Sequence, residues 1–301
     1  MTPSYRPVLP RLLLALLVLA APGAQADHPA GGAIDLADVA WIHGAEDCEA
    51  ARAAPDYVEW QRVRFRANTW VLRQNKCENY EGPFLYLFAG TERALLIDSG
   101  ATEAGGATLL EKVRDVTDLP LLVAHSHGHG DHRQGDAALA AAPDVEVVGI
   151  GEQAVRRRFG LDDWPGGSAA LDLGGRRIEI LPIPGHADDD LAWFDAASGI
   201  LVTGDTLYPG RLYITDWAQY RASTARLAAW AAERDVEAVL GTHIEMTSTP
   251  DVDYPIGTTW QPEEHVLPLT VDDIARLAEA AAAMETPERT HLGDFIIWPR
   301  S

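Results

Sequence analysis

The chain of 301 residues carries a formal net charge of −21 at pH 7, and its length suits one large domain. An acidic surface repels the phosphates of nucleic acids and the head groups of anionic lipids. We therefore expect no nucleic-acid partner and, once the leader described next is removed, no membrane partner.

Residues 1–26 have the pattern of a secretory signal peptide. Arg6 and Arg11 place positive charge around the start of an apolar run at residues 12–21, and Ala24-Gln25-Ala26 is a typical cleavage site. The run is too short to span a bilayer. The pattern predicts a periplasmic or secreted protein, with an uncleaved anchor as the alternative.

The chain has two cysteines, Cys48 and Cys77, and neither lies in a metal-binding motif. In an oxidising compartment an even pair of this kind indicates a disulfide, which would tie the segment at residues 27–68 to the first strands. Two separate thiols are the alternative.

After residues 27–68, which we interpret as an N-terminal extension, short apolar runs alternate with helical patterns. The runs predict strands at residues 70–73, 84–88, 94–97, 120–124, 145–150, 178–183, 191–194, 200–203 and 236–240. Helical spacing predicts helices at residues 108–115, 131–142, 152–159, 216–232 and 270–284. Thr270 is the expected N-cap of the last helix, with Asp273 three residues later.

Several of the predicted strands end in a residue that can bind a metal. These residues are Asp98, His127, His186, Asp205 and His243. Donors at one end of several strands are what a site on the rim of a sheet requires.

The segment at residues 125–132 holds four histidines and one aspartate. His127 and His129 are two residues apart, so an extended backbone directs both rings to one side. Imidazole and carboxylate without a thiolate suit zinc, with iron or manganese as alternatives. A solvated histidine-rich surface loop is the other interpretation.

The run from His127 to His132 resembles the H-x-H-x-D-H signature of the metallo-β-lactamase superfamily. The resemblance implies an α/β fold, a four-layer αββα sandwich with a dinuclear metal site at one edge of the sheets. We assign the domain to residues 69–260 and a C-terminal helix and tail to residues 261–301.

The same resemblance implies roles for individual residues. It places His127, His129 and His186 on one zinc ion, Asp131, His132 and His243 on the other, and Asp205 between both. Asp98 is expected to support the histidine loop by hydrogen bonds. His125 is expected to be a supporting or strand-end histidine, with a ligand role as the alternative.

The superfamily contains several kinds of hydrolase, and the bridging residue helps to separate them. Zinc β-lactamases have cysteine or serine where this chain has Asp205, whereas glyoxalase II-like thioesterases and lactonases have aspartate. The resemblance therefore implies an exported dinuclear zinc hydrolase that cleaves a small-molecule ester, lactone or thioester through a metal-bound hydroxide. A zinc β-lactamase, an iron-dependent redox protein and a metal-binding protein without turnover are the alternatives.

One residue of this centre and three residues that follow Asp205 are expected to act on the substrate. We expect Asp131 to act in catalysis by orienting the attacking group and accepting its proton. Tyr208 lies three residues after Asp205, as in lactonases where a tyrosine binds the substrate carbonyl, and a packed tyrosine is the alternative. Arg211 and Tyr213 are candidate substrate-binding residues, with a plain surface loop as the alternative.

Overall fold

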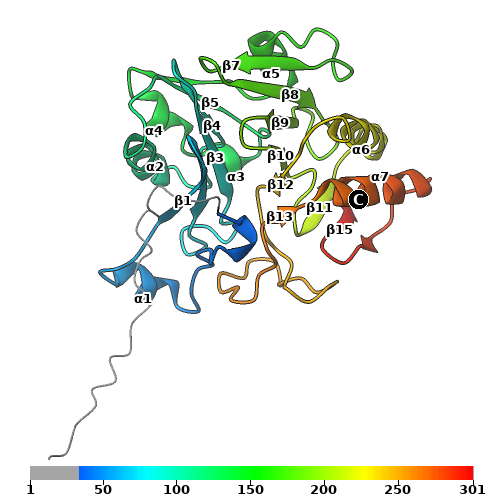
Figure 1. Cartoon of the computed structure of the whole chain (residues 1–301). Helices are drawn as coiled ribbons and strands as arrows, with labels where there is room; N and C mark the ends of the chain where they lie inside the picture. Colours follow the sequence, from blue (N-terminus) through cyan, green and yellow to red (C-terminus); the bar gives the residue numbers. More distant parts are fainter. Residues whose placement is uncertain (1–33, 301) are drawn as a thin grey trace, which may run out of the picture.

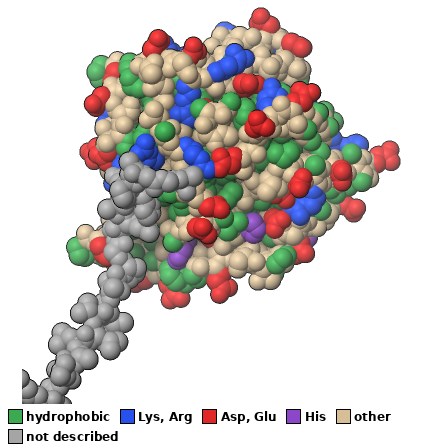
Figure 2. Space-filling view, in the orientation of Figure 1, with side chains coloured by type: hydrophobic (Ala, Val, Ile, Leu, Met, Phe, Trp, Pro, Cys, Tyr) green, Lys and Arg blue, Asp and Glu red, His purple; other side chains and the backbone are tan. Residues whose placement is uncertain are grey.

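The computed structural model describes residues 34–300, and the predicted signal peptide and its cleavage site lie outside these residues. Among the described residues, no helix has both the length and the apolar character needed to cross a membrane. The face shown in Figure 2 carries many acidic side chains with basic ones between them.

The first of two six-stranded sheets is built from the N-terminal half of the chain (Figure 1). Its strands follow sequence order: β1 (Trp60–Arg66), β2 (Thr69–Gln74), β3 (Phe84–Ala89), β4 (Ala94–Ile97), β5 (Leu121–Ala124) and β6 (Val145–Val147). Neighbours from β1 to β4 are antiparallel, whereas β4, β5 and β6 are parallel. Consequently β4 and β5 end at the same edge of the sheet.

The second sheet mirrors this arrangement with the C-terminal half. Its strand order is β13 (Pro268–Leu269), β12 (Ala238–Gly241), β10 (Ile200–Gly204), β9 (Leu191–Asp195), β8 (Arg177–Pro182) and β7 (Ala169–Asp172). β9 and β10 pair as an antiparallel hairpin, and β10 runs parallel to β12. A third small sheet contains β11 (Arg211–Ile214), β15 (Ile296–Pro299) and β14 (Thr290–His291), in that order.

Successive side chains of a strand point to opposite faces of the sheet, and this alternation gives the sandwich its four layers. Tyr86 and Phe88 of β3 face the core between the two sheets, whereas Leu85 and Leu87 face the core under the outer helices. Burying each such side chain contributes about 1.5–3 kcal/mol. The helices are α1 (Cys48–Ala53), α2 (Gly105–Arg114), α3 (Gly130–Arg133), α4 (Asp136–Ala140), α5 (Glu152–Phe159), α6 (Trp217–Ala231) and α7 (Val271–Ala283), preceded by one 3-10 turn, η1 (Leu36–Asp38).

The outer helices lie on opposite sides of the sandwich. Leu109 of α2 and Leu139 of α4 cover the first sheet, while Leu227 of α6 and Leu277 of α7 cover the second. The predicted four-layer αββα fold is confirmed. Thr270 caps α7 as expected, in a reciprocal capping box with Asp273.

The helix predicted at residues 131–142 is wrong, because the chain forms two short helices, α3 and α4, instead. Gly135 separates them and packs so closely that a Cβ there would lie 2.3 Å from the Ser99 carbonyl oxygen. The Ser99 hydroxyl donates to Asp136 at 2.7 Å. These contacts pull the chain against the end of β4 and bend it away from a continuous helix.

Residues on both sides of the predicted 69–260 domain join the sandwich. β1, within the predicted extension, pairs with β2, and its outward arginines alternate with buried Val63 and Phe65. After residue 260, β13 pairs with β12, and α7 covers the second sheet.

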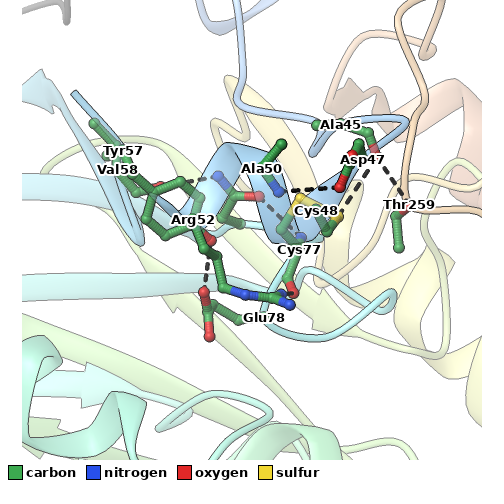
Figure 3. The surroundings of a disulfide bond; sticks show 11 residues. Ala45, Asp47, Cys48, Ala50, Arg52, Tyr57, Val58, Cys77, Glu78 and Thr259 are labelled. Carbon is green, nitrogen blue, oxygen red and sulfur yellow. Dashed lines mark hydrogen bonds between the residues drawn. A yellow bond between two sulfur atoms is a disulfide. The ribbon is translucent and has the colours of Figure 1, made fainter. Parts of the chain in front are cut away.

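The disulfide between Cys48 and Cys77 is confirmed (Figure 3). It joins α1 to the loop between β2 and β3. Around it, Arg52 donates to the Cys77 carbonyl, and Tyr57 donates to Glu78 at 2.6 Å. The N-terminal segment is thus fastened to the same loop by covalent and polar contacts.

Replacing both Cys48 and Cys77 by serine should lower the free energy of unfolding by about 3–4 kcal/mol, because the bond closes a loop over a sequence separation of 29. Guanidinium unfolding of the wild type and the double variant, each with and without reductant, measures this difference. Reductant should affect only the wild type. A loss below about 1 kcal/mol would contradict the prediction.

Candidate metal centre

The ends of strands from both sheets meet at one edge of the sandwich. β5 leads into the histidine loop, β8 is followed by His186, β10 by Asp205, and β12 by His243. Parallel pairing of β10 with β12 brings their carboxyl ends together, as pairing of β4 with β5 does in the other sheet. The fold therefore gathers residues that are more than 110 positions apart.

The first group of donors consists of His127, His129 and His186. Nδ1 of His129 lies 2.9 Å from Nε2 of both His127 and His186, and these two Nε2 atoms are 3.2 Å apart. Three ring nitrogens thus converge on one point.

The second group consists of Asp131, His132, Asp205 and His243. Nε2 of His243 lies 3.3 Å from Nε2 of His132 and 3.3 Å from Oδ2 of Asp131. Oδ2 of Asp131 is also 3.2 Å from Nε2 of His132. Carboxylate and imidazole donors alternate around this second point.

Asp205 lies between the two groups and presents one oxygen to each. Its Oδ2 is 3.6 Å from Nε2 of His186 and 3.9 Å from Nε2 of His127. Its Oδ1 is 3.4 Å from Nε2 of His243 and accepts a hydrogen bond from the Thr242 hydroxyl. The carboxylate is therefore oriented to bridge the two groups.

Three buried histidines form hydrogen bonds through Nδ1, the ring nitrogen that points away from the donor groups. These bonds determine which ring nitrogen carries the proton. Nδ1 of His132 contacts Oδ2 of Asp98 at 3.0 Å, and Nδ1 of His186 contacts the Tyr213 carbonyl at 2.6 Å. Nδ1 of His243 contacts the Glu81 carbonyl at 3.2 Å. Because carboxylate and carbonyl oxygens only accept, each Nδ1 donates, and each Nε2 of a neutral ring keeps a lone pair.

The donor set fits divalent metal ions for this reason. Lone pairs on nitrogens about 3 Å apart repel one another, and a cation placed between them turns the repulsion into coordination. Three imidazoles leave a fourth position open on a tetrahedral zinc, which is the arrangement of catalytic sites. Hydrogen bonds from the outer nitrogens are also typical of metal-binding histidines.

The pKa values differ between the two groups. Burial lowers the pKa of His127 well below 6.5 and that of His186 to about 4, so both rings are neutral at pH 7. Burial also acts to lower the pKa of His243, but Asp205 and Asp131 outweigh it and raise the pKa to about 9. At pH 7 a proton on His243 therefore offsets part of the carboxylate charge of the second group, and a bound cation would take the place of that proton.

Asp98 supports the histidine loop from behind and belongs to neither group of donors. Its Oδ1 accepts from the Ser126 backbone at 2.7 Å, and its Oδ2 accepts from the Ser126 hydroxyl at 2.9 Å and from His132. His125 also lies outside both groups and contacts Asp136 at 2.9 Å. The structure places both residues where the sequence analysis expects supporting roles.

The loop at residues 76–82 supports His243 in a similar way. The Glu81 carbonyl that binds His243 also accepts from Nζ of Lys76 at 3.3 Å, and the Tyr80 carbonyl accepts from it at 3.0 Å. Lys76 is buried, and burial lowers its pKa to about 8. It directly precedes the disulfide-bonded Cys77.

Two aspartates that hold the site together escaped the sequence analysis. Asp189 accepts from the backbone of Gly128 at 3.0 Å and of Gly151 at 2.6 Å. Asp190 accepts from the backbone of Ala187 at 2.7 Å. The run of three aspartates after His186 was the signal that could have revealed them.

A cavity of about 280 Å³ lies beside both groups. Its lining includes donor residues together with Glu81, Tyr208, Tyr213 and Arg300. Glu81 and Arg300 were not expected from the sequence, whereas both tyrosines were.

Arg211 is not among the residues that line this cavity. Its guanidinium donates to Glu245 at 2.6 Å and to Asp253 at 2.5 Å. The Tyr208 hydroxyl donates to the Arg211 carbonyl at 2.5 Å, so its proton is directed at the protein backbone. Arg211 therefore organises the wall around Tyr208.

Comparison with known proteins agrees with this geometry. Residues 81–243 match the family model described as the metallo-beta-lactamase superfamily. The chain belongs to this superfamily. The match begins at the loop that supports His243 and ends at His243 itself.

Curated relatives in the superfamily are hydroxyacylglutathione hydrolases. The protein of Anaeromyxobacter dehalogenans is 37% identical over 127 residues, covering 42% of this chain and 46% of that protein. The protein of Chromohalobacter salexigens is 34% identical over 165 residues, covering 53% and 56%. The chain thus spans about half the length of the curated relatives it matches.

Solved structures show the same fold at low identity. A metallo-beta-lactamase from Pontibacter korlensis superposes with a TM-score of 0.55 and 16% identity, over 75% of this chain and 100% of that one. One from Erythrobacter litoralis gives a TM-score of 0.56 and 18% identity, over 75% and 97%. These similarities support the architecture and leave the reaction open.

Replacing Asp98 by asparagine should weaken zinc binding about 10–100-fold, because the His132 ring loses the carboxylate that orients it. Competition with a zinc chelator measures the affinity. Asp136→Asn is the matched control, since Asp136 holds His125, which lies outside both groups. Equal affinities for Asp98→Asn and the wild type would contradict the prediction.

Proposed function

We propose that the protein is an exported metal-dependent hydrolase that cleaves a thioester, ester or lactone bond with two zinc ions. The observation that carries the proposal is the position of Asp205, whose two carboxylate oxygens face two separate groups of donors. In a structural metal site, protein residues fill every coordination position of the ion. Two groups of donors beside a cavity instead leave room for water and substrate, which suits catalysis.

His127, His129 and His186 would hold one ion, and Asp131, His132 and His243 the other, with Asp205 shared. When bound, such ions polarise a carbonyl oxygen and lower the pKa of water so that it attacks at neutral pH. The charges favour this role, because two divalent ions bring four positive charges and the carboxylates of Asp131 and Asp205 return two.

The residues of the chain supply orientation and proton transfer. Asp131 lines the cavity, so its carboxylate is placed to orient an attacking water and to accept its proton. His186 and His243 also line the cavity, and their outer hydrogen bonds keep their rings in fixed orientations. Tyr208 would bind the substrate oxygen only after its hydroxyl leaves the Arg211 carbonyl.

A thioester is the favoured substrate class because the curated relatives are named hydroxyacylglutathione hydrolases. A zinc β-lactamase is the second candidate, since the structural neighbours carry that name, but their identity of 16–18% supports the fold alone. Asp205 also occupies the place where zinc β-lactamases have cysteine or serine. Hydrolysis of nitrocefin by the purified protein tests this candidate.

Export to the periplasm or the medium is part of the proposal. The signal pattern at residues 1–26 and the disulfide between Cys48 and Cys77 support it, because disulfides persist in oxidising compartments. Fractionation of expressing cells, with the mature N-terminus sequenced, is the direct test.

Replacing Asp205 by asparagine should lower kcat at least about 100-fold and remove one zinc ion, since a bridging ligand affects the metals more than an outer partner does. Thioester turnover and elemental analysis measure the two effects. Asp56→Asn removes an exposed carboxylate and serves as the charge control. A variant with full turnover and two zinc ions would falsify the bridging role.

Dialysis against a chelator should abolish hydrolysis, and about two equivalents of zinc should restore it, because both groups must be filled. Elemental analysis of protein prepared without added metal distinguishes zinc from iron or manganese. Unchanged turnover after complete metal removal would exclude a metal-dependent hydrolase. A panel of substrates that all remain uncleaved with zinc loaded would instead favour a binding protein.

A further inference from the structure

Among the described residues that line the cavity, Arg300 is the one arginine, and no lysine lies among them. The acidic lining residues are Glu81, Asp131 and Asp205, and two of these belong to the donor groups. Arg300 is therefore the lining residue suited to bind an anion away from the metals.

The small third sheet holds Arg300 in position. β15 runs parallel to β11, and the Arg300 backbone donates to the Ile214 carbonyl at 2.9 Å. The guanidinium carbon lies 4.8 Å from the centre of the Tyr213 ring. The carbonyl of Tyr213 accepts the hydrogen bond from His186, so one residue connects Arg300 to the first donor group.

The charge of Arg300 is available to a ligand. Within residues 34–300, no carboxylate forms an ion pair with it, in contrast to Arg211, which is paired with Glu245 and Asp253. A guanidinium stacked on a ring keeps its N–H groups free at the edge, where they match the two oxygens of a carboxylate. Screening by salt limits repulsion from acidic groups elsewhere on the surface to about 8–10 Å.

We propose that Arg300 binds a carboxylate on the substrate, so that the substrate is an anionic thioester or ester. This inference rests on the proposed hydrolase function. The scissile carbonyl would face the donor groups while the substrate carboxylate contacts the guanidinium at the Tyr213 wall. Arg300 thereby takes the substrate-binding role that the sequence analysis gave to Arg211.

A pair of thioesters that differ by one charge tests the inference. Glutaryl and pentanoyl thioesters of the same thiol have similar length, and only the first carries a carboxylate. With the zinc-loaded full chain, Arg300→Met should raise KM for the glutaryl substrate about tenfold with kcat unchanged, equivalent to about 1.4 kcal/mol of binding. KM for the pentanoyl substrate should change less than twofold, and Arg300→Lys should recover part of the loss.

Arg289→Met is the matched control. Arg289 is also stacked on an aromatic ring of this sheet, 3.2 Å from the centre of Trp298, but it does not line the cavity. The Arg289→Met variant should keep the wild-type preference for the glutaryl over the pentanoyl substrate. Equal KM increases for both substrates in Arg300→Met, or the same loss in Arg289→Met, would overturn the inference.

Binding of products separates this inference from the hydrolase proposal. Glutarate and pentanoate can each place one carboxylate on zinc, and only glutarate has a second one for Arg300. Calorimetry should show tighter binding of glutarate by the zinc-loaded wild type, with the preference lost in Arg300→Met. If Arg300→Met loses the preference for glutarate but the wild type cleaves no thioester, the role of Arg300 is supported and the hydrolase proposal is rejected. If the wild type cleaves thioesters but Arg300→Met keeps the preference, the hydrolase proposal stands and the role of Arg300 is rejected.

Discussion

Hydrogen bonds on the far side of the buried histidines are the constraint on which the site depends. In each one the outer nitrogen carries the proton and donates it to an oxygen, so that in the neutral ring the lone pair is on the nitrogen that faces the donors of the same group. The acceptors are Asp98, the Tyr213 carbonyl and the Glu81 carbonyl, which come from different sheets and loops. The metal site is therefore correct only when both sheets and the third sheet are in place.

The sequence predicted the fold, and the structure brings the expected donors together, because both leave local signals in the sequence. The histidine loop carries its chemistry within six residues, and the buried strands have apolar runs of the expected length. His186, Asp205 and His243 each have weak local patterns, and their order after the loop identified them. The structure places all seven residues in two groups at one edge, as the resemblance implied.

Features that depend on packing could not be predicted in this way. Arg211 and Arg300 are both arginines in polar surroundings, and no local pattern shows that Arg211 is paired with Glu245 while Arg300 reaches the cavity. β1 was missed because its arginines obscured the alternation of Val63 and Phe65. The break between α3 and α4 depends on the contact of Gly135 with Ser99, which lies in the loop after β4.

Because of the disulfide, the anchoring of the loop beside the cavity depends on whether the surrounding compartment is oxidising or reducing. Cys77 follows Lys76 in this loop. The Lys76 ammonium donates to the Glu81 carbonyl, which in turn orients His243. A chain retained among reducing thiols would keep every donor residue yet lose the covalent clamp on this wall. Maturation outside the cytoplasm would then finish the active centre as well as deliver the protein.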